Sequence, residues 1–323
     1  MLRRVALSLF VSALGAVLLL TACGREEFAP DVFAPVTALT PARETAAPVN
    51  LIDALNASLA GQDMRLAVAR VETITMAGAE NEVGRTLYAS DRQLRLPYRW
   101  VPGDVRRLAD GENITYLVDQ SDGTATPGLP NALTEAAIDR AMETWDGVPC
   151  SSLQVLKRSD TGEDPDIIDF MLGMGAPGNP FLADIVNAGF APAAFFEALA
   201  PGGSSYIIAV TFTLIFVDDE GYPTDINQDH YLDTALKEVY YNNRFPWSVT
   251  GAGGVDVETI ALHENGHSFE LGHFGNIFVT ESNSKLHVAP RAVMNAVYLG
   301  PMRELATSDQ GAFCSLFGSW PNR

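Results

Sequence analysis

The segment VDVETIALHENGHSFELGHFG, from Val255 to Gly275, holds three of the five histidines of this 323-residue chain. His263 and His267 stand four residues apart, and His273 follows six residues later. Residues four apart lie on one face of an α-helix, so the first two imidazoles can face a single metal ion. Imidazole nitrogens are common zinc ligands. The spacing therefore predicts a zinc site held by all three histidines.

Glu264 directly follows the first of these histidines and is rotated by about 100° around the same helix. Its carboxylate is expected beside the metal, where it can accept a proton from a water molecule. The third ligand, His273, cannot reach the same metal from the same helix. The helix must therefore end before it, and Gly272 can provide the turn because glycine adopts positive φ without steric cost.

The pattern HENGHSFELGH resembles the metzincin clan of zinc metalloproteases, and within it the matrixin-like branch. The motif of that branch is H-E-x-x-H-x-x-G-x-x-H, followed by a methionine turn. The three histidines and the glutamate match, but Glu270 stands where the family has its turn glycine. Either Glu270 adopts the left-handed conformation, at a cost of about 1 kcal/mol, or the helix runs longer and Gly272 makes the turn. We expect a glycine at position 270 to leave the zinc affinity equal or higher.

The resemblance implies a zinc-dependent endopeptidase with Glu264 as the general base. It also implies a Met-turn at Met294, 21 residues after His273, whose thioether packs beneath the ligands without coordinating the metal. The tyrosine that some branches use as a further ligand is missing, because Ala296 occupies its position. The alternative is a binding protein that keeps the fold without efficient turnover. The reason to consider it is the negative charge of Glu270, which is expected close to the zinc.

The implied fold is an α+β domain over residues 113–323, a twisted mixed sheet of about five strands with three main helices and the histidine helix in the middle. The pattern of apolar residues predicts strands at 114–118, 153–156, 167–171 and 206–217, and helices at 134–145, 192–199 and near the C-terminus. The resemblance implies that 206–217 is an exposed sheet edge that pairs with the substrate backbone. Its dense hydrophobicity fits an interior strand equally well.

Residues 1–22 have the features of a bacterial export signal. Arg3 and Arg4 precede a short apolar run that ends in the sequence LTAC at Cys23. This ending resembles a lipoprotein processing box, so we expect Cys23 to carry a lipid that anchors the chain in the cell envelope, facing the periplasm or the outside. The alternative is a plain secretory signal.

Two segments separate this signal from the implied catalytic domain. Residues 23–49 are rich in Ala, Pro and Thr, which predicts a flexible tether. Residues 50–112 are expected to contain one helix and two strands. They form either a pro-region or accessory unit, or an N-terminal extension of the catalytic domain.

The cysteines are consistent with an exported protein. The chain has three of them, and lipidation of Cys23 would leave Cys150 and Cys314. Two remaining cysteines in an oxidising compartment suggest one disulfide. Buried free thiols are the alternative.

The net charge of −19 excludes a conventional nucleic-acid partner, because a phosphate-binding face needs clustered Lys and Arg. The acidic surface provides solubility or favours basic peptides. Within it, Asp225, Asn227 and Asp229 have a spacing that calcium ligands use. His230 stands where the corresponding loop needs glycine, so a calcium site and a solvated loop are both open. His230 and His287 lack the spacing for a second zinc site.

Overall fold

The computed structural model describes residues 49–77, 83–92, 95, 97–107, 112–119, 123–125, 129–283 and 285–321. They belong to one compact unit, Glu44–Arg323. The expected export signal (1–22) and the lipidation site at Cys23 lie outside the described residues, as does the tether except for its last residue. Among the described helices, none is long and apolar enough to cross a membrane.

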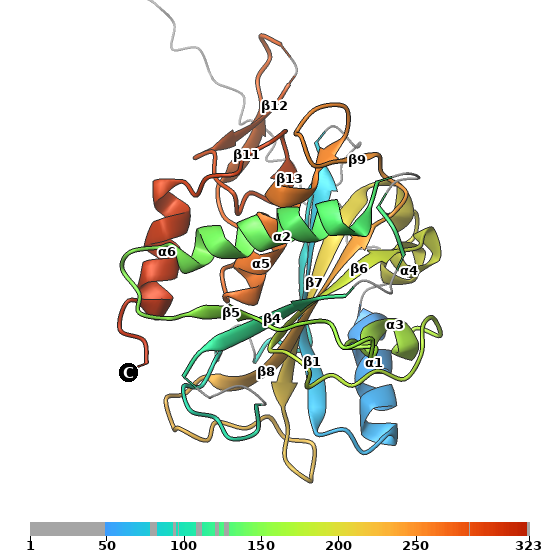
Figure 1. Ribbon diagram of the computed structural model, residues 1–323, viewed down its shortest axis with the longest axis vertical. Coiled ribbons are helices and arrows are strands. Elements are labelled where there is room, and N and C mark those ends of the chain that lie inside the picture. Colours follow the sequence, from blue (N-terminus) through green and yellow to red (C-terminus); the bar gives the residue numbers. More distant parts are fainter. Residues whose placement is uncertain are drawn as a thin grey trace, which may run out of the picture. The chain divides into compact units, whose positions relative to one another are not determined.

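A nine-stranded mixed sheet runs through this unit (Figure 1). Its order is β13 (Val297–Tyr298), β1 (Leu66–Met76), β7 (Ile207–Phe216), β8 (Leu232–Asn242), β6 (Ile185–Ala191), β4 (Ile114–Val118) and β5 (Val155–Lys157). Two short strands are added at β1 and β8, namely β2 (Thr86–Tyr88) and β3 (Tyr98–Arg99). The strands β1, β7 and β8 are antiparallel neighbours, whereas β8, β6, β4 and β5 run parallel.

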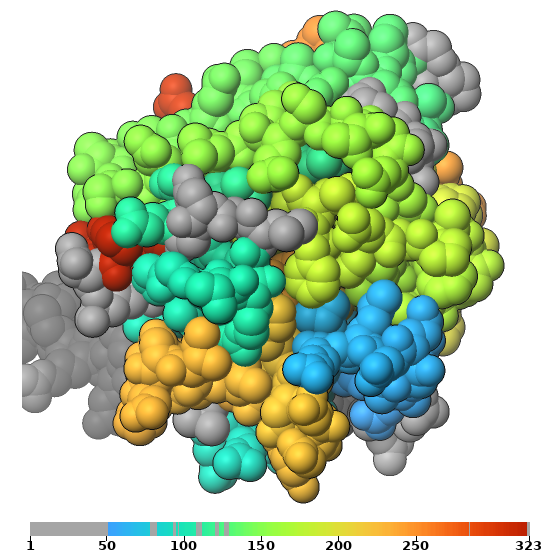
Figure 2. Space-filling view, turned by 60° about the horizontal axis from the view of Figure 1, so that its bottom comes forward, coloured from blue at the N-terminus to red at the C-terminus, as the bar shows by residue number. Residues whose placement is uncertain are grey.

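Helices cover both faces of the sheet (Figure 1). One face carries α2 (Asn131–Asp146), α5 (Val257–Ser268) and α6 (Thr307–Phe317). The other face carries α1 (Val49–Gly61), α3 (Ile168–Met171), α4 (Ala193–Leu199) and the 3₁₀ turn η1 (Gly203–Ser205). Figure 2 shows α1, in blue, at the surface beside the segment around α3. Each face of the sheet therefore has its own apolar core.

Four short strands lie outside the large sheet. They form two pairs, β9 (Trp247–Ser248) with β10 (Val255–Asp256) and β11 (Asn276–Val279) with β12 (Leu286–Ala289). The first pair leads directly into α5, and the second follows the turn after it.

The expected α+β class with a mixed sheet is confirmed. The prediction of about five strands and three main helices concerned residues 113–323, whose described part contributes six strands to the main sheet and five α-helices. The segment 50–112 contributes the expected helix, α1, and three strands of the sheet, β1, β2 and β3, where two strands were expected. Within residues 113–323 the strands β6, β8 and β13 were not expected. In β8, Asp233, Lys237 and Glu238 interrupt the apolar pattern, yet all three are fully buried.

The segment 167–171 forms the short helix α3 and not the expected strand. The backbone N–H groups of Ile167 and Ile168 donate to the carboxylate of Glu238 on β8, each at 3.1 Å. These bonds replace the ladder that a strand would need. A short apolar run does not by itself distinguish a buried helix from a strand.

Of the two readings of 206–217, the structure has the interior strand, β7, and not the exposed edge that the resemblance implied. It pairs with β8 on one side and with β1 on the other, where Leu66 lies opposite Phe216 and Thr75 opposite Ile207. Because β1 belongs to the segment 50–112 and lies inside the common sheet, this arrangement favours the reading of that segment as an extension of the domain.

Candidate metal centre

The helix α5 carries the first two histidines into the interior of the protein. Asp256 caps its N-terminus as an acceptor for the backbone N–H of Thr259 at 3.1 Å. The Nε1 of Trp145 on α2 donates to the carbonyl of Leu262 at 2.9 Å, which holds the two helices together. Every residue of α5 is buried between α2 and the sheet. The site is therefore held by rigid elements on both sides.

The three histidines converge on one point. Their Nε2 atoms form a triangle with sides of 3.1 Å (His263 to His267), 3.1 Å (His267 to His273) and 3.2 Å (His263 to His273). A tetrahedral zinc ion with Zn–N bonds of about 2.05 Å places its nitrogen ligands ~3.3 Å apart. Within the described part of the chain this is the one group of three His, Cys, Asp or Glu side chains close enough to share a metal. The structure thus brings together the ligands that the spacing predicted.

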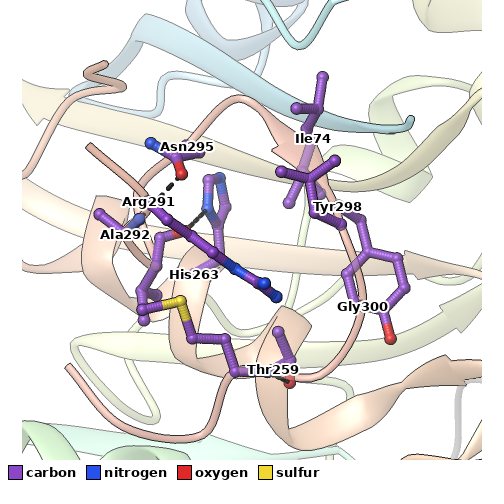
Figure 3. Close-up of a pocket in the computed structure, with 12 residues that line it drawn as sticks. Ile74, Thr259, His263, Arg291, Ala292, Asn295, Tyr298 and Gly300 are labelled. Atoms are coloured by element: carbon purple, nitrogen blue, oxygen red, sulfur yellow. Dashed lines mark hydrogen bonds between the residues drawn. The ribbon is translucent and has the colours of Figure 1, made fainter. Parts of the chain in front are cut away.

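The outer ring nitrogens show which atoms face the centre. The Nδ1 of His263 lies 2.6 Å from the carbonyl oxygen of Val293, a bond drawn in Figure 3. The Nδ1 of His267 lies 2.7 Å from the carbonyl oxygen of Leu271. A carbonyl can only accept, so both Nδ1 atoms carry the proton and both Nε2 atoms present lone pairs to the centre.

The three imidazole rings are also expected to be neutral, because burial lowers their pKa values. Burial lowers the pKa of His263 to about 4, and it lowers the pKa values of His267 and His273 well below the usual range. Neutral imidazole is the form that binds a metal. Lone pairs that meet at 3.1–3.2 Å repel one another unless a cation lies between them. The donor set therefore fits a zinc ion.

The turn that brings the third ligand into place is made by Glu270. The helix ends at Ser268, and Glu270 has a φ of 68°, so it adopts the left-handed conformation itself. Of the two alternatives for the turn, this is the first, and Gly272 is not needed for it. The carboxylate of Glu270 is bound by β8, where Thr234 donates to it at 2.6 Å and Lys237 at 3.0 Å.

Glu264 is fully buried on the same helix as the first two ligands. The hydroxyl of Thr211 on β7 donates to its Oε2 at 2.5 Å, whereas its Oε1 has no hydrogen-bond partner. Burial raises the pKa of Glu264 well above its usual range, the hydrogen bond from Thr211 lowers it, and the nearby Glu72 raises it. One oxygen of the carboxylate thus has a hydrogen-bond donor and the other has none.

Thr211 was not identified from the sequence. The only signal for it is the period of two in β7, which points Thr211 and Thr213 to the same face of the sheet. That face is the one on which the histidine helix packs.

Met294 packs against α5. It is fully buried, and a Cβ added at Gly266 would lie 2.3 Å from its Sδ, so the glycine makes room for the thioether. The backbone N–H groups of Val293 and Met294 donate to the buried carboxylate of Asp309 on α6, at 3.0 and 3.2 Å. Asp309, which the sequence did not single out, therefore holds the turn that also supplies the carbonyl partner of His263.

A small pocket of about 20 Å³ lies beside His263, with room for one water molecule (Figure 3). Arg291, Thr259, Ile74 and Tyr298 are among its lining residues. The hydroxyl of Tyr298 accepts the backbone N–H of Asp256 at 3.1 Å. This bond ties the tyrosine to the start of α5.

Cys150 and Cys314 form a disulfide with an S–S distance of 2.00 Å and a Cα–Cα distance of 5.7 Å. It joins the loop after α2 to the helix α6. Because α6 carries Asp309, the disulfide fixes the helix that supports the methionine turn.

The acidic loop before β8 uses its side chains internally. The carboxylate of Asp225 accepts the backbone N–H groups of Asp229 and His230, at 3.1 and 3.0 Å, and Asn227 donates to Asp229 at 3.1 Å. The loop stands at the surface, in gold in Figure 2. These bonds favour the solvated loop over a calcium site. His287 stacks on Phe278, with ring centres 5.4 Å apart, away from the three ligands.

No family model and no curated protein matches the chain.

Proposed function

We propose that the protein is a zinc-dependent endopeptidase. The observation that carries the proposal is the triangle of Nε2 atoms at 3.1–3.2 Å with the buried carboxylate of Glu264 on the same helix. Three histidine ligands are typical of catalytic zinc sites, which leave a fourth position open. A zinc ion bound here would polarise a substrate carbonyl and lower the pKa of a water molecule.

Glu264 is proposed to move the proton. Its unpartnered Oε1 accepts a proton from the attacking water as the water oxygen bonds to the scissile carbonyl carbon, and the same carboxyl returns a proton to the amine as the C–N bond breaks. The high pKa caused by burial favours this return, and a cation at the centre favours the ionised form that accepts the proton. Thr211 keeps the carboxylate in one orientation through Oε2.

A second candidate is a metzincin-like binding protein with little or no turnover. The observation that favours it is that β7 has a strand paired on each of its sides and so has no free edge. The strand β1 covers β7, and the outer side of β1 is in turn covered by β2 and β13. A substrate therefore cannot add as a strand to β7, and it would have to enter beside His273, the least buried of the three ligands.

The proposed setting is the bacterial cell envelope, with a lipid on Cys23 as the membrane anchor and proteins or peptides as substrates. The disulfide between Cys150 and Cys314 supports an oxidising compartment. The charge of −19 supports the absence of nucleic acid among the partners.

The test combines metal analysis with a peptide-library cleavage assay. Purified protein is expected to carry about one zinc per chain, to cleave peptides, and to stop when a chelator is added. Glu264→Gln should keep the zinc and lose nearly all cleavage, whereas the exposed Glu304→Gln serves as the matched control and should behave as wild type. Zinc without any cleavage would refute the endopeptidase and support the binding protein. Cleavage retained in Glu264→Gln would refute the role of the glutamate.

A further inference from the structure

Four charged side chains beside the proposed metal ligands are almost completely buried. Arg70 and Glu72 come from β1, Lys237 from β8 and Glu270 from the turn after α5. Their side chains are 7%, 0%, 0% and 4% exposed, respectively. Charged residues are almost never buried unless they are paired, so each of them has to be accounted for.

Lys237 uses all three of its donors. Its Nζ donates to Glu270 Oε2 at 3.0 Å, to Thr213 Oγ1 at 2.9 Å and to the carbonyl oxygen of His267 at 3.3 Å. Its ammonium also lies 4.9 Å from the ring centre of Tyr98. A single side chain on β8 thus binds both a metal ligand and the residue that makes the turn to the next ligand.

Glu270 is held on its other side as well. Thr234 donates to its Oε1 at 2.6 Å, and Arg70 Nη2 lies 4.0 Å from its Oε2. Glu270 is three residues from His267 and three residues from His273, and its φ of 68° sets the direction in which the chain returns. The carboxylate of Glu270 thus gives the buried ammonium of Lys237 an opposite charge, a contact that a glycine could not provide.

Glu72 completes the cluster at the second ligand. Its Oε1 lies 3.2 Å from Nδ1 of His267, and its Oε2 pairs with Nε of Arg70 at 2.8 Å. Outer partners of this kind fix the orientation of a ligating imidazole. The cluster therefore touches the second ligand through both its ring and its carbonyl group.

We propose that Lys237 and Glu270 form a buried latch that positions His267 and His273 for metal binding, with Glu72 and Arg70 as its extension to the ring of His267. The latch rests on the proposed metal site and not on peptidase activity. It gives a reason for the glutamate at position 270. It also reverses the expectation from the sequence that glycine would serve there equally well, because Glu270→Gly leaves the ammonium of Lys237 buried without its counter-charge.

The test is a double-mutant cycle read out as zinc affinity in competition with a chromophoric chelator. Lys237→Met, Glu270→Gln and Glu270→Gly are each expected to weaken zinc binding by at least about tenfold. Lys237→Met combined with Glu270→Gln should lose less than the product of the two single losses, because residues in direct contact are coupled. The matched control is the half-exposed surface pair Lys157 and Glu135, with the changes Lys157→Met and Glu135→Gln, which should leave zinc affinity unchanged.

Folding is checked separately by near-UV circular dichroism. If Lys237→Met does not fold, Glu270→Gln and Glu270→Gly keep the lysine and still carry the test. Their cobalt-substituted forms should show altered d–d absorption bands, which report the geometry of the ligands. Folded variants with wild-type zinc affinity and wild-type cobalt spectra would overturn the latch. Failure of wild-type protein to cleave peptides while these losses in zinc affinity are seen would refute the endopeptidase and leave the latch standing.

Discussion

Thr211 donates its hydroxyl hydrogen to Oε2 of Glu264 across 2.5 Å, and this bond joins the strand β7 to the helix α5. It is the one side-chain hydrogen bond found for the carboxylate, whose other oxygen has no partner. An interior strand of the sheet thereby determines how the proposed general base is oriented.

The first prediction concerns this bond. Thr211→Val should lower the rate of peptide cleavage by ~10- to 100-fold at saturating substrate, because the carboxylate loses its fixed orientation while general-base catalysis contributes about 10²–10⁴. Bound zinc, measured by atomic absorption, should stay at the wild-type level. Thr211→Ser keeps the hydroxyl and is the control, with nearly normal activity expected. Equal rates in the serine and valine variants would show that the bond has no role in orientation.

The second prediction concerns removal of the metal. Three neutral imidazoles meet at 3.1–3.2 Å, so the folded state should be stabilised when zinc binds. At a free zinc concentration of about 100 times Kd, the gain in the free energy of unfolding is about 2.7 kcal/mol. Thermal unfolding with zinc and with a chelator measures it. His263→Ala should abolish the difference, whereas His287→Ala should retain it. A melting temperature that does not respond to zinc in wild-type protein would contradict the metal site.

The third prediction concerns the support of the methionine turn. Asp309 accepts the backbone N–H groups of Val293, Met294 and Ala306, at 3.0, 3.2 and 2.8 Å. Asp309→Asn replaces one acceptor oxygen by a donor and should reduce the free energy of unfolding by about 2 kcal/mol, because a buried N–H group loses its acceptor. Chemical denaturation provides the measurement. The exposed Gln310→Ala on the same helix should cost much less, and equal costs for both variants would argue against a special role of the carboxylate.

The fourth prediction concerns pH. Burial raises the pKa of Glu238 to about 8 from an ordinary value of 4.5. Hydrogen bonds from Tyr240 and from the backbone N–H groups of Ile168 and Ile167 lower this pKa, whereas the charge of Asp169 raises it. Between these two values the folded state binds a proton that the unfolded state has released. The free energy of unfolding should therefore fall as the pH rises from about 5 to 8, by an amount on the order of a few kcal/mol.

Denaturant unfolding at a series of pH values measures this dependence. Glu238→Gln cannot titrate, so its stability profile should be flatter than that of wild type over the same range, whatever its absolute stability. Parallel profiles for the two proteins would show that the carboxyl of Glu238 ionises as an ordinary glutamate does.

The local part of the site was predictable because it depends on spacing along one helix. His263 and His267 are one turn apart in any α-helix, and Asp256 caps that helix through a bond to Thr259 only three residues away. Such contacts do not depend on the fold around them. The predicted convergence of the three imidazoles is accordingly what the structure contains.

The strand β8 was not predictable in the same way. Asp233, Lys237 and Glu238 interrupt its apolar pattern and mark it as a polar loop when it is read alone. Each is buried because a partner from elsewhere in the chain pairs with it. Asp233 pairs with Arg106 at 2.7 Å, and Lys237 pairs with Glu270 at 3.0 Å.

The sequence by itself thus determined which histidines converge, which glutamate is the proposed base and which helix presents them, since these follow from short-range geometry. Only the tertiary structure decided that β1 covers β7, that Thr211 orients Glu264 and that Glu270 belongs to a buried ion pair. The physical reason is that burial of a charge or closure of a sheet edge depends on partners far away in the sequence. The residue pattern of a single segment does not identify those partners.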